Sequence, residues 1–280
     1  MTTTSKVYVV TGAQGNIGQP ICKGLAQSGA TVVMVVRDPA KAEDVRAALV
    51  EETRNPRIET LACDLSSLDS VRKAAKALLG RHPVIHGLIN NAAAFSAERK
   101  TTKDGFELQL GVNHLAHFLL TLLLEPALFA AKDARVVVVG MPSGTPIRLD
   151  DLMLEKKYDG MTAYGMSKAA NLAFTRELAE RWKGKVAVNA VHPGMTKTTL
   201  INEAPLAIRL VFALFASRQE KGAETPLYVA TAPELAGVTG KFFVRKKDTA
   251  YPKGANEDPR VWKQLWAQSE KLVGLSPARA

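Results

Sequence analysis

Six runs rich in apolar residues lie between residues 6 and 194. They are separated by turns and by segments whose apolar residues have helical spacing. These runs span 6–12, 31–38, 58–65, 84–94, 134–140 and 185–194. Strands that are apolar on both faces and alternate with helices are typical of a parallel sheet covered on both sides. The sequence therefore predicts an α/β fold, a doubly wound Rossmann sheet in three layers, as a single domain over residues 1–280. Such sheets bind ligands beyond the carboxyl ends of their strands, so the residues that follow each run are the candidate site residues.

Composition and charge argue against several other classes of protein. Two cysteines, Cys22 and Cys63, are too few for a disulfide framework and are typical of reduced, buried thiols. The first residues lack the pattern of a signal peptide, and the apolar run 206–216 is too short to span a bilayer, so we expect a cytoplasmic protein. The net charge of +10 is scattered along the sequence without an aromatic platform, which favours a basic surface suited to a phosphorylated cofactor over nucleic-acid binding.

The turn after the first run is rich in glycine. Between a strand and a helix, glycines permit a tight turn and a close approach to a pyrophosphate, whose charge is bound by the free N–H groups of the helix N-terminus. The sequence therefore predicts a dinucleotide site at this turn, formed by Gly12, Gln14, Gly15, Asn16, Ile17 and Gly18.

The ends of the next three runs predict the rest of the cofactor site. An arginine directly after the second strand pairs with a ribose 2′-phosphate, whereas an acidic residue there accepts from a free 2′-hydroxyl. Arg37 comes first, so we expect NADP(H), while Asp38 could instead cap the next helix. The residues expected to flank the adenine and to line the floor of the cofactor site are Asp64, Leu65, Asn91, Ala92 and Ala93.

Tyr164 and Lys168 lie four residues apart in the predicted helix 162–182 and therefore share one face. Free tyrosine has a pKa of about 10 and exchanges protons poorly at neutral pH. A lysine ammonium beside it stabilises the phenolate and lowers this pKa, as does the positive ring of an oxidised nicotinamide. The pair therefore suits a group that gives a proton to a carbonyl oxygen as a hydride arrives.

Together these motifs resemble the short-chain dehydrogenase/reductase superfamily over nearly the whole chain, and within it the branch of retinol dehydrogenases and light-dependent protochlorophyllide reductases. The stretches that carry the resemblance are DGFELQLGVNHLAHFLLT, NNAAAF, AYGMSK, HPGMTKT, GKFF and LWAQSEKLVGL. The resemblance implies a tetrad of Asn, Ser, Tyr and Lys, in which Asn113 holds a proton path to Lys168 through a helix kink and a water. It also implies that the nicotinamide carboxamide is held by the segment with Pro193, Gly194, Thr196 and Thr198.

The resemblance breaks at the end of the fifth run, where the family has two small residues and the second is the catalytic serine. Gly140 and Met141 occupy these places, and methionine cannot donate a hydrogen bond to a carbonyl. In one hypothesis Ser143 replaces the missing serine as a catalytic residue. In a second, the substrate is already polarised, or is reduced at an activated C=C bond, so that Tyr164 suffices. In a third, hydride transfer is lost and the chain is an NADPH-binding sensor, scaffold or cyclase-like catalyst.

The segment at about 199–221 is expected to form a lid over the substrate, because residues 205–219 are largely apolar and the resemblance places the lid there. An apolar lid implies a lipophilic small-molecule substrate. Arg209 and Arg218 flank the apolar residues, which leaves a peripheral membrane contact open.

No metal site is predicted, because His114 and His117 share a helix face without further ligands at metal spacing; a structural or substrate-facing role is expected for them. The resemblance implies a homodimer or homotetramer assembled through the predicted helices 104–128 and 162–182. As a whole, the sequence predicts an NADPH-dependent oxidoreductase, a carbonyl reductase or alcohol dehydrogenase acting on a lipophilic small molecule.

Overall fold

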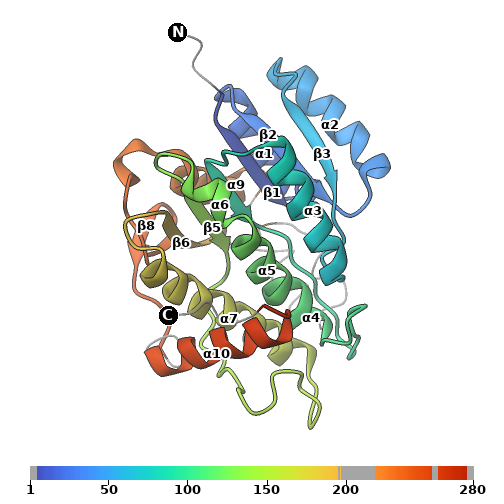
Figure 1. Cartoon of the computed structure of the whole chain (residues 1–280), viewed down its shortest axis with the longest axis vertical. Coiled ribbons are helices and arrows are strands. Elements are labelled where there is room, and N and C mark those ends of the chain that lie inside the picture. Colours follow the sequence, from blue (N-terminus) through green and yellow to red (C-terminus); the bar gives the residue numbers. More distant parts are fainter. Residues whose placement is uncertain (1–4, 195, 197–217, 254–257, 276–280) are drawn as a thin grey trace.

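The computed structural model describes residues 5–194, 196, 218–253 and 258–275. Within these residues one sheet runs through the molecule in the order β3-β2-β1-β4-β5-β6-β7-β8 (Figure 1). Its strands are β1 (Val7–Thr11), β2 (Thr31–Val36), β3 (Ile58–Ala62), β4 (Gly87–Asn90), β5 (Arg135–Val139), β6 (Ala187–His192), β7 (Phe242–Val244) and β8 (Lys247–Thr249). Neighbouring strands are parallel, except that β7 and β8 are antiparallel.

Helices cover both faces of this sheet. Along β2, Val33 and Val35 face one hydrophobic core, and Val32 and Met34 face the other. The helices of the first core are α3 (Leu68–Arg81), α5 (Ala116–Leu123), α6 (Glu125–Phe129), α7 (Gly160–Arg181) and α10 (Pro259–Leu272). Those of the second core are α1 (Gly18–Gln27), α2 (Pro39–Thr53) and α9 (Gln219–Thr231). The prediction of a doubly wound α/β sheet in three layers is confirmed.

The predicted helix 104–128 is wrong as a single element. The structure divides it into α4 (Leu108–Leu110), the π-helical turn η1 (Gly111–Leu115), α5 and α6. Pro126 lies in the first turn of α6, where its missing N–H group costs nothing, so it marks the start of a new helix. A π turn is an irregularity that apolar spacing does not reveal, although the resemblance does imply a kink here.

The structure also contains elements that the apolar pattern did not indicate. Strand β7 is only three residues long, and all three residues of β8 are exposed, so neither forms an apolar run. A short 3-10 helix, η3 (Pro233–Leu235), follows α9. In the described part of the chain, no helix is both long and apolar enough to cross a membrane.

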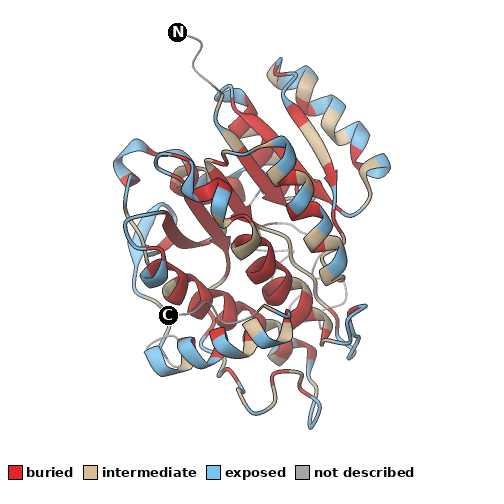
Figure 2. Ribbon diagram, viewed as in Figure 1, coloured by how far each residue is buried: buried red, intermediate tan, exposed pale blue. Residues whose placement is uncertain are grey.

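The C-terminal helix α10 packs on α7 and α5. Trp266 contacts Phe118 of α5 at a ring distance of 4.8 Å and stacks on Phe174 of α7 at 6.0 Å. Trp262 and Leu265 belong to the same core, and the opposite face of α10 is exposed (Figure 2). Helix α10 therefore covers part of the surface of α5 and α7, the helices expected to form a dimer interface.

Candidate active site

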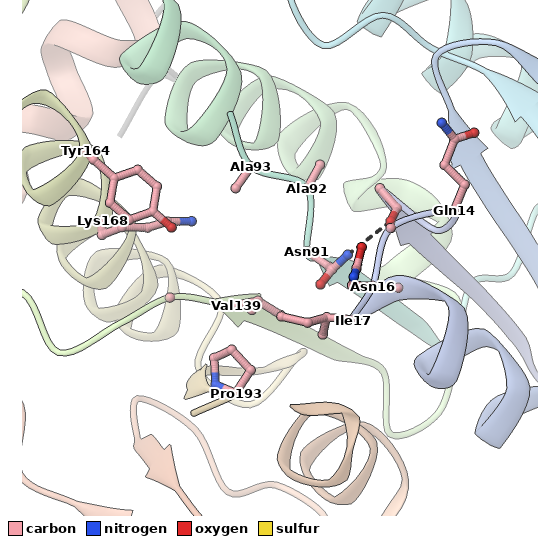
Figure 3. Close-up of a pocket in the computed structure, with 14 residues that line it drawn as sticks. Gln14, Asn16, Ile17, Asn91, Ala92, Ala93, Val139, Tyr164, Lys168 and Pro193 are labelled. Atoms are coloured by element: carbon pink, nitrogen blue, oxygen red, sulfur yellow. Dashed lines mark hydrogen bonds between the residues drawn. The ribbon is translucent and has the colours of Figure 1, made fainter. Parts of the chain in front are cut away.

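A cavity of about 280 Å³ opens at the carboxyl ends of β1, β4 and β5, between the glycine-rich turn and α7 (Figure 3). Most of the residues that the sequence suggested for a cofactor meet here. The cavity is lined by Gly12, Gln14, Gly15, Asn16, Ile17, Gly18, Asn91, Ala92, Ala93, Val139, Gly140, Tyr164, Lys168 and Pro193. Val139 was not predicted; its position as the last residue of β5 is the signal that could have found it.

The glycine turn fits a phosphate group. Gly12 has a φ of +61°, and a Cβ on it would lie 2.8 Å from the Ala92 Cα. Ile17, whose side chain cannot accept a hydrogen bond, occupies the N-cap position of α1. Ile17 and Gly18 line the cavity, so the positive end of the α1 helix dipole faces it, which suits the pyrophosphate of a dinucleotide.

Gly18→Ala tests this turn, because a Cβ at Gly18 would lie 2.2 Å from the Gly12 carbonyl oxygen. We expect dinucleotide affinity to fall by about tenfold or more, since overpacking against backbone costs about 1–3 kcal/mol. Fluorescence titration with NADPH measures the loss. Gly80→Ala is the matched control, because nothing lies within 4 Å of a Cβ at that helical position. Equal affinity in both variants would contradict a phosphate-binding turn.

The floor of the cavity is tied together by hydrogen bonds between β1 and the residues after β4. The side-chain amide of Asn91 donates to the Thr11 carbonyl oxygen at 2.9 Å. The backbone N–H groups of Asn91 and Ala92 donate to the Thr11 hydroxyl oxygen at 2.9 and 3.0 Å. Asn91 and Ala92 therefore line the cavity from a fixed backbone.

At the adenosine end, Arg37 is exposed directly after β2. The Asp38 carboxylate accepts hydrogen bonds from the N–H groups of Ala40 and Lys41 at 3.1 and 3.3 Å, so it caps α2. Of the two roles left open for Asp38, the structure shows the cap. The arginine is therefore the side chain of this pair that remains available to a ligand.

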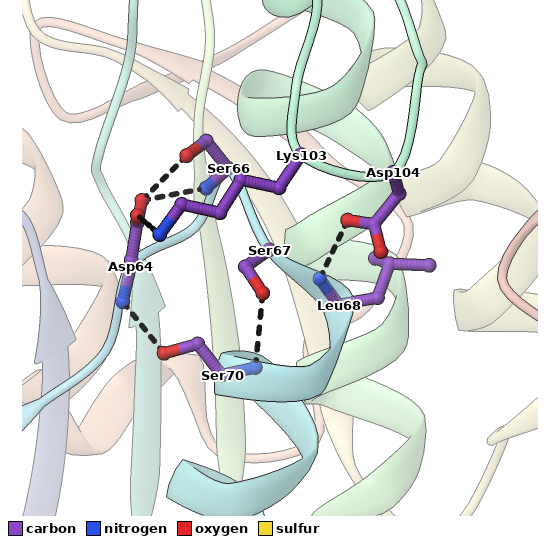
Figure 4. A network of polar contacts seen from close by, with 7 residues as sticks. All are labelled: Asp64, Ser66, Ser67, Leu68, Ser70, Lys103 and Asp104. Atoms are coloured by element: carbon purple, nitrogen blue, oxygen red, sulfur yellow. Dashed lines mark hydrogen bonds and ion pairs between the residues drawn. The ribbon is translucent and has the colours of Figure 1, made fainter.

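Asp64 and Leu65, expected to flank the adenine, lie outside the lining of the cavity. The Asp64 carboxylate accepts from the N–H and hydroxyl groups of Ser66 at 3.0 and 2.7 Å and forms an ion pair with Lys103 at 2.9 Å (Figure 4). Burial opposes the ionised form, but these bonds outweigh burial and lower the pKa of Asp64. Leu65 packs against the hydrophobic core. The pattern could not reveal Lys103, which comes from a distant loop.

Tyr164 and Lys168 share one face of α7 and point into the cavity (Figure 3). The Lys168 ammonium lies 5.4 Å from the centre of the Tyr164 ring, and Phe95 contacts the same ring edge-on at 5.8 Å. Burial raises the pKa of Tyr164 to about 12 and lowers that of Lys168 to about 8. The pKa of Tyr164 is thus raised, whereas a neighbouring lysine was expected to lower it, because the effect of burial dominates.

Asn113 lies in the π turn η1 and is fully buried. Its side chain accepts from the Ala94 N–H at 2.7 Å and donates to the Ala94 carbonyl and the Ser167 hydroxyl, both at 3.0 Å. The side chain of Asn113 thus holds the loop after β4 against α7 at Ser167, the residue directly before Lys168. The helix kink implied by the resemblance is this π turn.

Ser143 lies outside the lining of the cavity. It is 3% exposed, and its hydroxyl donates to the Gly165 carbonyl at 2.7 Å. The hydroxyl proton is thus used within the protein, so this arrangement does not offer the donor expected for a replacement of the missing serine. Met141 is half-buried, and the cavity wall here is formed by Val139 and Gly140.

The segment after β6 is described only in part. Pro193 lines the cavity, and Gly194 has a φ of +81°, which favours glycine. Thr196 is buried, and its methyl group lies against Gly222 of α9. Thr198 and the lid residues 199–217 lie outside the described residues. Among the described residues, no cluster of His, Cys, Asp or Glu side chains could hold a metal ion.

Comparisons with known proteins agree with this geometry. A family model of short chain dehydrogenases matches residues 6–207. Human retinol dehydrogenase 14 is 38% identical over 96% of this chain and 87% of its own length, and mouse retinol dehydrogenase 13 is 38% identical over 99% and 86%. The structure of an uncharacterized protein from Mycobacterium paratuberculosis has a TM-score of 0.78 and 31% identity, over 98% of this chain and 95% of that one. The complex of Pseudomonas aeruginosa RhlG with NADP has a TM-score of 0.68 and 26% identity, over 85% and 94%.

The matches extend over most of the chain, and the two curated relatives named here are retinol dehydrogenases. Short-chain dehydrogenases are oxidoreductases that use nicotinamide dinucleotides. The glycine turn, Tyr164 and Lys168 line one cavity that suits such a cofactor. The chain belongs to the short-chain dehydrogenase family, in its retinol dehydrogenase-like branch.

Proposed function

We propose that the protein is an NADPH-dependent oxidoreductase that interconverts a carbonyl and an alcohol on a lipophilic small molecule. One observation carries the proposal: Tyr164 and Lys168 line the same cavity as the glycine turn at the start of α1. A proton donor and a dinucleotide site that share one cavity are what a carbonyl reductase needs.

In this proposal the bound dinucleotide supplies or accepts a hydride at the reacting carbon. The Tyr164 hydroxyl gives its proton to the carbonyl oxygen during reduction and takes it back during oxidation. Burial keeps Tyr164 protonated, which suits the acid role. For the reverse reaction the phenolate needs positive charge beside it, which Lys168 and the oxidised nicotinamide together would provide.

Direct measurement of turnover tests the proposal. We expect lipophilic aldehydes, ketones or quinones to oxidise NADPH in the presence of the protein. The loss of NADPH absorbance measures this turnover. Tight NADPH binding without turnover of any of these compounds would contradict it and would favour a non-redox role.

Preference for NADPH depends on Arg37 in this proposal, because Asp38 is occupied as a helix cap. We expect Arg37→Glu to weaken NADPH binding by about tenfold to a hundredfold, since a hydrogen bond to a charged group contributes about 1.5–3 kcal/mol. NADH binding should change far less. Lys76→Glu, an exposed position on α3, removes the same charge as a control. Equal losses of NADPH and NADH affinity in Arg37→Glu would contradict a role of Arg37 in the preference for NADPH.

We further propose that Tyr164 acts without a serine partner, because the Ser143 hydroxyl donates to Gly165. Ser143→Ala should then lower the free energy of unfolding by about 1 kcal/mol while kcat stays within about threefold. Met141→Ser should raise kcat/KM for unactivated ketones by about tenfold or more, because a donor to the developing oxyanion contributes about 10²–10³ in rate. Met141→Ala is the control for side-chain size. A collapse of kcat in Ser143→Ala would show instead that Ser143 is the catalytic donor.

We propose a lipophilic and already polarised substrate, such as a conjugated aldehyde, because Tyr164 then needs no serine donor beside it. The relatives named above are called retinol dehydrogenases, and retinol is a long apolar alcohol whose aldehyde is conjugated.

For assembly, we propose that the four-helix dimer through α5 and α7 does not form, because α10 covers that face. The expected location remains the cytoplasm.

A further inference from the structure

His117 lies buried on α5 beneath the cavity, and the proposed reaction gives it no role. Only 2% of the residue is exposed. Its Nε2 atom lies 2.9 Å from the hydroxyl oxygen of Thr11, the last residue of β1. Its Nδ1 atom lies 3.0 Å from the backbone oxygen of Asn113 in η1. The ring therefore joins the end of the first strand to the turn that carries Asn113.

The partners of His117 determine where its proton lies. A backbone carbonyl can only accept, so Nδ1 must carry the hydrogen that is donated to Asn113. In a neutral ring Nε2 then has a lone pair and accepts from the Thr11 hydroxyl. This is the Nδ1–H tautomer.

The other contacts of Thr11 agree with that direction. Its hydroxyl oxygen accepts from the N–H groups of Asn91 and Ala92, so the hydroxyl hydrogen must point elsewhere. Two acceptors are within reach, His117 Nε2 at 2.9 Å and the Ile89 carbonyl at 3.4 Å. The shorter contact is the one to His117, which completes a chain of hydrogen bonds from the cavity floor to η1.

We propose that His117 is a positioning residue which, as the neutral Nδ1–H tautomer, fixes the Thr11 hydroxyl under the cofactor floor and the Asn113 carbonyl in the π turn. The inference rests on the proposed function, because it assigns a role within that site. Through Thr11 the ring holds the Asn91–Ala92 backbone that lines the cavity. Through Asn113 it holds the backbone at the place where the resemblance puts the proton path to Lys168.

Two titratable groups act on this ring, Lys168 from α7 and His114 from η1. Burial, with the Lys168 cation, lowers the pKa of His117 to about 4. Protonation would also place a second cation near Lys168 and would turn the Nε2 acceptor into a donor. The neutral ring therefore suits both its polar partners and its charged neighbour.

The first test needs no activity. In the full-length wild-type protein, nitrogen-15 NMR of the imidazoles should show for His117 a neutral ring with hydrogen on Nδ1 that does not titrate between pH 8 and about 5. His117→Asn assigns that signal by its disappearance. If the signal that disappears in His117→Asn has its hydrogen on Nε2, or titrates near pH 6.5, the proposal is overturned.

Two variants separate the two contacts. In His117→Asn the amide nitrogen can still reach the Asn113 carbonyl, but the contact to Thr11 is lost. In His117→Gln the longer amide can accept from Thr11, but the donor at Nδ1 is lost. We expect His117→Asn to weaken NADPH binding about tenfold and to lower kcat less, and His117→Gln to show the reverse order, since a buried hydrogen-bonding group left without its partner costs about 1–3 kcal/mol.

A double-mutant cycle with Thr11→Val completes the test. If the ring acts on the cofactor through Thr11, Thr11→Val combined with His117→Asn should weaken NADPH binding no more than Thr11→Val alone. His114→Asn is the matched control, because this second buried histidine bonds to Ser269 and Asn171, away from the cavity. Additive losses in the cycle, or the same pattern in His114→Asn, would show a merely structural role.

These measurements distinguish the two proposals. A wild-type protein that binds NADPH but turns over no carbonyl would contradict the proposed function. The NMR signal and the binding cycle would still decide the role of His117, because neither measures turnover.

Discussion

Tyr164→Phe is expected to lower kcat by about 10³-fold or more while the affinity for NADPH stays within about threefold, because it removes a general acid that contributes about 10²–10⁴ in rate. The phenylalanine ring keeps the edge-on contact with Phe95 at 5.8 Å, so packing around the cavity is preserved. Only the proton that would be given to the carbonyl oxygen is lost. Steady-state kinetics and NADPH titration of the same preparation give both quantities.

Tyr158→Phe is the matched control for this prediction. Its hydroxyl donates to the Ser96 carbonyl at 3.1 Å and accepts from Gln109, outside the lining of the cavity. We expect a modest loss of stability in this variant and near-normal turnover. If Tyr164→Phe kept its activity toward carbonyls, the acid/base role of Tyr164 would be wrong.

Lys168→Met is expected to abolish turnover and, at the same time, to stabilise the fold. A shift of the Lys168 pKa from 10.5 to about 8 corresponds to a cost of about 3 kcal/mol at pH 7. Methionine fills a similar volume without the charge, so the free energy of unfolding should rise by an amount of that order, less the lost contact with the Tyr164 ring. Urea unfolding at pH 7 measures the difference.

The pH dependence gives an independent check on Lys168. Because its pKa is lower in the folded than in the unfolded chain, the unfolded chain binds more protons between about pH 8 and 10.5. The wild-type protein should therefore gain stability from this group as the pH rises through that range, and Lys168→Met should lack the gain. Lys76→Met, on the exposed face of α3, serves as the control. A destabilised Lys168→Met with an unchanged pH profile would mean that the charge is already well solvated.

Features that depend on local sequence could be predicted. The apolar runs predict β1 to β6 because a buried parallel strand must be apolar on both faces. The glycine turn could be predicted from the glycines between the first strand and the first helix. The structure requires glycine there, because a Cβ on Gly12 or Gly18 would meet backbone atoms. Tyr164 and Lys168 could be paired because helix spacing alone puts them on one face.

Features that depend on contacts between distant residues could not be predicted. The bond from Ser143 to Gly165 joins residues 22 positions apart, and its direction decides whether the hydroxyl faces the cavity. The bridge from His117 to Thr11 connects residues 106 positions apart. In both cases the residue type was visible, but its partner was set by the folded chain.

The packing of α10 also bears on the order in which the protein folds. The tryptophans of α10 complete the apolar surroundings of Phe118 and Phe174, although α10 spans Pro259–Leu272 and so comes near the end of a chain of 280 residues. During synthesis, the strands β1 to β6 and helix α7 leave the ribosome long before the helix that covers them. The half of the molecule that carries Tyr164 therefore acquires its final packing only after α10 has been synthesised, and until then it presents an apolar face that a chaperone could bind.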